Sequence, residues 1–141
     1  MNTYDTPFIV PAIERATHMM ALWIERTFRD PRLTQAEAHV LAYLASHAPC
    51  TINDLHRSFG HKRSTLTSIL DRLEERGWIA RVGHPTSRRL VLVELTEAGR
   101  AVAQRVTEAL RALEGRVLAR TGDADPATFL RVLRVLEEEL A

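Results

Sequence analysis

The sequence predicts a mainly helical α+β fold, in which helices at both ends of the chain flank shorter helices and a β-hairpin. Three observations predict it. Apolar residues recur at helical spacing near both ends, two helix-capping patterns lie between residues 34 and 54, and the periodicity changes from 3.6 to 2 after Gly77. The length of 141 residues predicts a single domain, 1–141.

The composition is that of a soluble globular protein, with 45% hydrophobic and 26% charged residues. No apolar run approaches the roughly 18 residues of a membrane span, and the N-terminus lacks the pattern of a signal peptide. A single cysteine, Cys50, excludes an intrachain disulfide. These features favour a cytoplasmic protein with no membrane partner.

Positive charge is concentrated in the middle of the chain. The net charge is +1, but residues 51–100 carry nine Lys or Arg against six acids, whereas residues 1–50 and 101–141 each have one excess acid. This distribution is expected if only the middle of the chain faces a polyanion.

The first two helices have clear limits. Residues 7–30 carry apolar side chains at helical spacing up to Asp30-Pro31, a dipeptide that disfavours further helix. Thr34 and Glu37 then form a capping box for a helix that ends before Pro49.

A second capping pattern, Thr51 with Asp54, predicts a short helix that ends at Gly60. A third helix follows from about Lys62 to Arg76, and Gly77 is suited to its C-terminus. Alternation then predicts strands at 78–82 and 90–95, joined by a turn-rich segment with a basic end.

The last two helices begin at Thr96 and at Asp125-Pro126. The complete order is that of a winged helix-turn-helix, with a DNA-binding lobe at 32–99. Segments 7–30 and 100–140 have more apolar surface than is required to cover the core of one winged helix. Because such surface has to be buried, we expect these segments to be dimerisation helices.

Two stretches resemble the MarR family of regulators, named for multiple antibiotic resistance. Residues 64–81, STLTSILDRLEERGWIAR, are similar to the family's recognition helix and wing entry. Residues 88–100, RRLVLVELTEAGR, are similar to its wing-to-helix signature. The resemblance covers nearly the whole chain and implies a two-fold dimer, binding to pseudo-palindromic DNA and frequent control by a small molecule.

The chain departs from the family pattern at two positions. Ser87 stands where the wing commonly has an Asp that braces the wing arginine, so the brace here is expected to be weaker and neutral. Lys62 stands where a small N-cap residue is usual, which is unfavourable for the helix dipole by a few tenths of a kcal/mol. A nearby DNA phosphate would offset that cost.

The polar face at the start of the third helix is the predicted DNA-reading surface, because a helix in the major groove contacts bases through its N-terminal side chains. Arg63 is suited to contact guanine, and the serines and threonines beside it are suited to contact bases or phosphates. The alternative is that these serines and threonines only form a solvated helix face. The full predicted set is Arg63, Ser64, Thr65, Thr67 and Ser68.

Other cations are predicted to contact DNA phosphates or the minor groove. Arg57, Lys62 and Arg72 are phosphate candidates, although Arg72 can instead pair with Glu74 or Glu75. Arg88 and Arg89 lie at the wing, and by family position Arg89 is expected to enter the minor groove.

Two further sets of residues are predicted to form a dimer interface and an effector pocket. The interface set is Ile9, Ile13, Phe129, Leu133, Leu136 and Leu140; some of these can equally belong to an intrachain core. The pocket set is Met19, Met20, Trp23, His39, Tyr43 and His47, which suits a small aromatic or amphipathic effector but is also consistent with ordinary packing.

Other functional classes have little support in the sequence. It contains no phosphate loop, nucleophile elbow or pair of catalytic carboxylates, so an enzyme is not expected. The histidines match no metal-ligand spacing, no cofactor is expected, and Cys50 is expected to be a small buried residue. The alternatives that stay open are a winged-helix protein–protein interaction module and a metal- or redox-responsive regulator.

Overall fold

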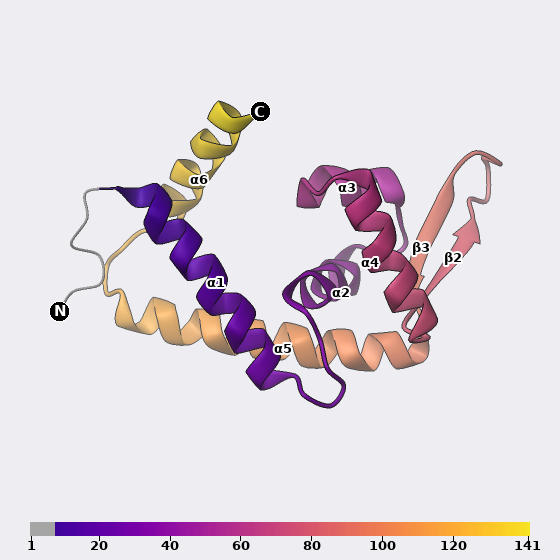
Figure 1. Cartoon of the computed structure of the whole chain (residues 1–141), viewed down its shortest axis with the longest axis horizontal. Helices are drawn as coiled ribbons and strands as arrows, with labels where there is room; N and C mark the ends of the chain where they lie inside the picture. Colours follow the sequence, from indigo (N-terminus) through magenta and orange to yellow (C-terminus); the bar gives the residue numbers. More distant parts are fainter. Residues whose placement is uncertain (1–7) are drawn as a thin grey trace. The chain divides into compact units, whose positions relative to one another are not determined.

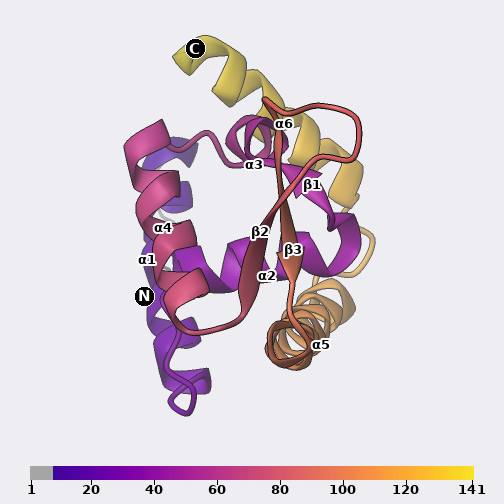
Figure 2. The same ribbon diagram turned by 90° about the vertical axis from the view of Figure 1, so that its right-hand side faces the viewer.

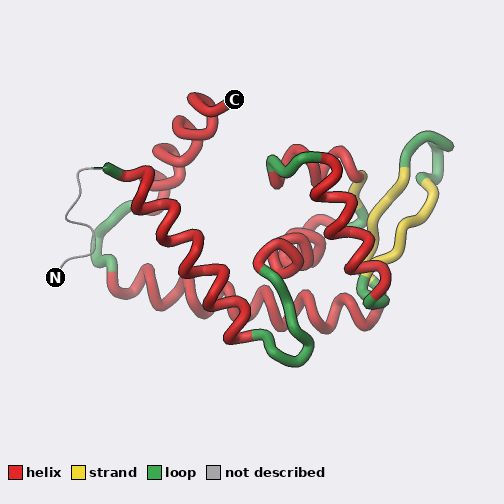
Figure 3. Tube along the Cα trace, in the orientation of Figure 1, coloured by secondary structure: helices red, strands yellow, loops and turns green. Residues whose placement is uncertain are grey.

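The computed structural model describes residues 8–141, and most of them are helical (Figures 1 and 3). The elements are α1 (Ile9–Thr27), α2 (Gln35–His47), β1 (Cys50–Thr51), α3 (Ile52–Phe59), α4 (Arg63–Glu75), β2 (Ile79–Gly83), β3 (Val91–Leu95), α5 (Glu97–Arg120) and α6 (Pro126–Leu140). Their order confirms the predicted mainly helical α+β fold. Pro7, where the predicted first dimerisation segment begins, lies outside the described residues.

The chain divides into two compact units. The first extends to Thr107 and contains α1 to α4, the sheet and the first part of α5, and the second spans Glu108–Ala141. The single domain 1–141 and the DNA-binding lobe at 32–99, both expected from the sequence, stay predictions. Within residues 8–141, no helix has the length and apolar character that crossing a membrane requires.

Both predicted capping boxes are present. The Thr34 hydroxyl accepts a hydrogen bond from the Glu37 backbone N–H at 3.2 Å, and the Glu37 carboxylate accepts one from the Thr34 N–H at 3.3 Å. Thr51 and Asp54 make the same reciprocal pair at 3.1 and 3.0 Å. Each box satisfies backbone donors at a helix start that would otherwise have no intrahelical partner.

The core of the first unit is made by the facing sides of α2, α3 and α4, the sheet and the first part of α5 (Figure 2). Burial of each large aliphatic side chain contributes about 1.5–3 kcal/mol. The fully buried side chains are Leu33, Val40, Leu41, Leu44, Leu55, Leu66, Ile69, Leu70, Leu73, Val93 and Val106.

A three-stranded antiparallel sheet, in the order β1-β3-β2, lies beside these helices (Figure 2). The hairpin β2–β3 was predicted, but β1 was not, since it has only two residues. Cys50 pairs with Val93 and Thr51 with Leu92. Because Thr51 is also the N-cap of α3, the same residue joins the wing to the helix-turn-helix.

A close backbone contact fixes the junction between the wing and α5. The Thr96 hydroxyl donates to the Gly77 carbonyl at 2.6 Å and accepts from the Gly99 N–H at 3.0 Å. Gly99 is buried against the Trp78 backbone, and a Cβ at this position would collide with the Trp78 carbonyl. Only glycine therefore fits here.

Candidate DNA-binding surface

Helix α4 has a buried face and an exposed polar face. Its buried residues are Leu66, Ile69, Leu70 and Leu73, as the sequence predicted. The remaining positions of its first two turns are exposed: Arg63, Ser64, Thr65, Thr67 and Ser68. Lys62 is the N-cap, and no side chain caps this helix. The partial positive charge of the helix start is therefore not offset by a capping side chain.

Helix α3 and the turn at Gly60 set the direction of α4. Gly60 adopts the left-handed conformation, with φ of 65°, and ends α3 three residues before α4 begins. Arg57 is exposed on α3, where its guanidinium contacts Asp54 at 2.6 Å. Hydrogen bonds from the Thr51 backbone and hydroxyl and from Arg57 hold the pKa of Asp54 below its ordinary value.

The wing joins β2 to β3 through residues 84–90. A backbone bond from His84 N–H to the Leu90 carbonyl closes the loop at 3.1 Å. Ser87 accepts from the Arg89 backbone N–H at 3.4 Å, so its hydroxyl contacts the main chain of Arg89 rather than the guanidinium. Arg88 and Arg89 both have exposed side chains.

An arginine that the sequence analysis did not select braces the wing against α4. Arg81 on β2 contacts Asp71 at 2.6 Å and lies 3.6 Å from Glu74. The alternative pairing of Arg72 with Glu74 or Glu75 is not formed, and among the ion pairs of residues 8–141 none involves Arg72. All ten predicted DNA-contact residues, Arg72 included, are exposed.

A second arginine ties the end of α4 to the start of α2. The Arg76 guanidinium donates to the Glu37 carboxylate at 2.9 Å and lies 3.9 Å from the centre of the Trp78 ring. Glu37 is the one charged or polar residue in the described range that is buried. No local pattern reveals this pair, since its members are 39 residues apart.

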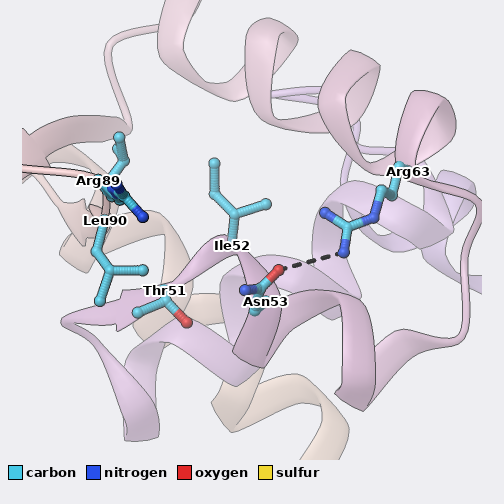
Figure 4. A pocket seen from close by; sticks show the side chains of 7 residues that line it. Thr51, Ile52, Asn53, Arg63, Arg89 and Leu90 are labelled. Atoms are coloured by element: carbon cyan, nitrogen blue, oxygen red, sulfur yellow. Dashed lines mark hydrogen bonds between the residues drawn. The ribbon is translucent and has the colours of Figure 1, made fainter.

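A notch of about 200 Å³ opens where α3, α4 and the wing approach each other (Figure 4). Arg63 lies at one end of this view and Arg89 at the other, and the Asn53 side chain lies between them. The lining residues are Thr51, Ile52, Asn53, Arg63, Arg89, Leu90 and Val91. Arg63 donates to the Asn53 side-chain oxygen at 3.4 Å.

Three of the six predicted effector-pocket residues belong to one aromatic cluster. Tyr43 stacks on His47 at 4.1 Å, and Phe59 meets Tyr43 edge-on at 5.3 Å and His39 at 4.5 Å. Partial burial and the nearby His61 lower the pKa of His39. On α1, Trp23 is half-buried, whereas Met19 and Met20 are exposed.

The predicted interface residues leave much apolar surface uncovered in a single chain. Ile9, Phe129 and Leu140 are 57, 59 and 77% exposed, and Ile13, Leu133 and Leu136 are half-buried. None of the six is fully buried, so each leaves apolar surface that a second chain can cover, and the half-buried three also pack within the chain.

Cys50 is buried, and burial together with nearby Asp54 raises its pKa to about 11. The thiol is therefore protonated near neutral pH, as expected of a small core residue. Across the described range, no three His, Cys, Asp or Glu side chains gather where they could hold a metal ion.

The helix-turn-helix, the hairpin beside it and the exposed basic face together define a DNA-binding winged-helix protein. The model of the MarR family matches residues 33–91. The transcriptional repressor Rv2887 of Mycobacterium tuberculosis is 32% identical over 126 residues, which cover 89% of this chain and 83% of the relative. The chain belongs to the MarR family and is a DNA-binding transcriptional regulator, not an enzyme.

Solved structures share the fold. The Staphylococcus aureus MepR–DNA complex has a TM-score of 0.83 at 18% identity and covers 96% of this chain and 100% of that one. The structure of Bordetella bronchiseptica BpsR has a TM-score of 0.68 at 24% identity, and the match covers 99% of this chain and 97% of that one. The DNA binding of BpsR is regulated by 6-hydroxynicotinic acid. Matches to three further bacterial regulators span 62 to 71% of those relatives' length.

Proposed function

We propose that this chain is a homodimeric repressor that reads a pseudo-palindromic operator and releases it when a small aromatic or amphipathic molecule binds. The observation that carries the proposal is the exposed polar face of α4, which begins with Arg63 and is continuous with Ser64, Thr65, Thr67 and Ser68. Arg63 forms a bidentate contact with guanine, and the hydroxyl groups contact neighbouring base edges or phosphates.

Cations around this face bind the DNA backbone and set the position of α4 in the groove. Lys62 and Arg72 contact phosphates on either side of the recognition helix, and Arg57 does so from α3. Arg89 enters the minor groove from the wing, with Arg88 beside it. The exposure of all five side chains supports these roles. A transcriptional regulator with this role is located in the cytoplasm, where it binds the chromosome.

A second copy of the chain covers the apolar surface of α1 and α6. Exposed Ile9, Phe129 and Leu140 support this dimer, since side chains of this kind stabilise an interface when they leave water. Two-fold symmetry then places the two α4 helices at inverted half-sites about one helical turn apart.

The effector binds beside the aromatic cluster of His39, Tyr43 and His47, with Met19, Met20 and Trp23 contributed by α1. Stacked rings and flexible thioethers suit an aromatic ligand. The relative BpsR responds to such a molecule, and the relative Rv2887 is a repressor, which supports the proposed sense of regulation.

The proposal is tested with the full chain and a fluorescent duplex of the DNA upstream of its own gene. We expect a dimer by sedimentation, anisotropy saturation at one dimer per inverted repeat, and release by at least one compound in a panel of aromatic acids and amphipathic cations. Binding that is independent of the inverted repeat, or of salt between 50 and 200 mM, would contradict it. No measurable binding to any duplex would favour the protein–protein module.

A further inference from the structure

The notch between α3, α4 and the wing presents nitrogen donors from three different elements. Arg63 comes from α4, Asn53 from α3 and Arg89 from the wing, and none of the residues that line the notch is acidic. The nearest acid in the sequence, Asp54, is engaged with Thr51 and Arg57. The notch therefore favours a group that carries only acceptors, such as a DNA phosphate.

The contact between Arg63 and Asn53 fixes which way the Asn53 amide faces. A guanidinium has five N–H donors and no acceptor, so the amide oxygen must face Arg63. The distance of 3.4 Å joins Arg63 Nη2 to Asn53 Oδ1, and this is the one hydrogen bond of the Asn53 side chain within residues 8–141. The amide NH₂ group is left pointing away from Arg63 (Figure 4).

The same contact leaves Arg63 able to read a base. It occupies one N–H of Nη2, and the second Nη2 N–H remains, together with the neighbouring donor on Nε or Nη1, as a pair for the O6 and N7 atoms of guanine. Asn53 thus restricts a long, exposed side chain without consuming the donors that recognition requires. A restrained arginine loses less conformational freedom when it binds DNA.

We propose that Asn53 is a positioning residue for DNA recognition, which holds Arg63 through its side-chain oxygen and donates its NH₂ group to a backbone phosphate at the notch. This inference rests on the proposed function of Arg63. Asn53 couples base reading by α4 to a phosphate anchor on α3, so that the two contacts form together.

The test uses the full chain and a duplex selected by the wild-type protein from a randomised library, with affinity measured by fluorescence anisotropy. Asn53→Ala is expected to weaken binding about three- to tenfold. The slope of log affinity against log salt should stay unchanged, because a neutral donor displaces no counterion. Lys62→Ala, which removes a proposed phosphate contact of a cation, is the matched control and should reduce that slope by about 0.9.

Asn53→Asp separates positioning from a structural role. An acid in the first turn of α3 favours the helix dipole, so the thermal midpoint should stay equal or rise. The variant keeps an oxygen toward Arg63 but turns a second, charged oxygen toward the phosphate. We therefore expect it to bind DNA more weakly than Asn53→Ala, a result that no loss of folding would explain.

A double-mutant cycle with Arg63→Ala completes the test. Asn53→Ala should cost threefold or more in the wild-type background and less than twofold in the Arg63→Ala background. Equal costs in both backgrounds, or wild-type binding by Asn53→Asp, would overturn the inference while leaving the proposed function intact. Wild-type affinity of Arg63→Ala itself would overturn both.

Discussion

Replacement of Glu37 by alanine should destabilise the fold through two separate contacts. One carboxylate oxygen accepts from the Thr34 N–H and caps α2, and the other accepts from Arg76 at the end of α4. The side chain is only 6% exposed, whereas that of Arg76 is 30% exposed. Loss of Glu37 therefore leaves one backbone donor and one half-buried guanidinium without their acceptor.

The expected loss is about 3 kcal/mol in the free energy of unfolding. Breaking a buried ion pair by removal of one partner costs about 3–5 kcal/mol, and the partial exposure of Arg76 lowers this toward about 2. The lost capping bond adds about 1 kcal/mol. Contact of the guanidinium with the Trp78 ring remains and limits the loss.

Urea unfolding of the full chain, followed by circular dichroism at one fixed protein concentration, measures this loss. Glu75→Ala is the matched control, because Glu75 is exposed on α4 and should change stability by less than about 0.5 kcal/mol. An equal effect of Glu37→Ala and Glu75→Ala would refute the reasoning, and so would additivity of Glu37→Ala with Arg76→Ala.

Three further predictions follow from individual positions. Arg89→Ala should weaken operator binding at least tenfold, about 1.4 kcal/mol, in a gel shift, and an unchanged affinity would rule out its role in the wing. Gly99→Ala should lower stability by at least about 2 kcal/mol in thermal melts, because its Cβ collides with the Trp78 carbonyl, whereas Gly115→Ala, which meets nothing, should leave it equal or higher. The Cys50 thiol, with its pKa of about 11, should react with iodoacetamide at pH 8 only as fast as the protein unfolds. Rapid labelling of the folded protein would show that the thiol is neither buried nor protonated.

The helices could be predicted closely because their limits are set by local chemistry. Thr34 with Glu37 and Thr51 with Asp54 satisfy donors three residues away, so each box is visible in four residues of sequence. The apolar spacing of α4 likewise identified its buried face, and with it the exposed residues from Arg63 onward.

The features that were missed depend on contacts between distant parts of the chain. Strand β1 has two residues and is defined only by its pairing with β3, about 40 positions later. Arg76 reaches Glu37 across 39 residues, and Arg81, not Arg72, pairs with Glu74. Charge spacing along one helix identifies possible partners on that helix, but it does not reveal a competing arginine on the neighbouring strand.

The candidate site combines both situations. Sequence reasoning selected Arg63 and Arg89 by helix position and wing position, but it did not select Asn53, which becomes relevant only when α3 and the wing meet at the notch. In the aromatic cluster it found His39, Tyr43 and His47, which share one helix, and missed Phe59 and His61, which the chain brings there from beyond α2.

The central claim is that the start of α4 reads base sequence. Its most direct test compares the affinity of the full chain for the selected duplex with its affinity for a scrambled duplex of the same composition, for wild type and for Arg63→Ala. We predict that Arg63→Ala lowers this ratio about tenfold or more, as loss of a bidentate guanine contact requires. An unchanged ratio, with wild-type stability, would contradict the account.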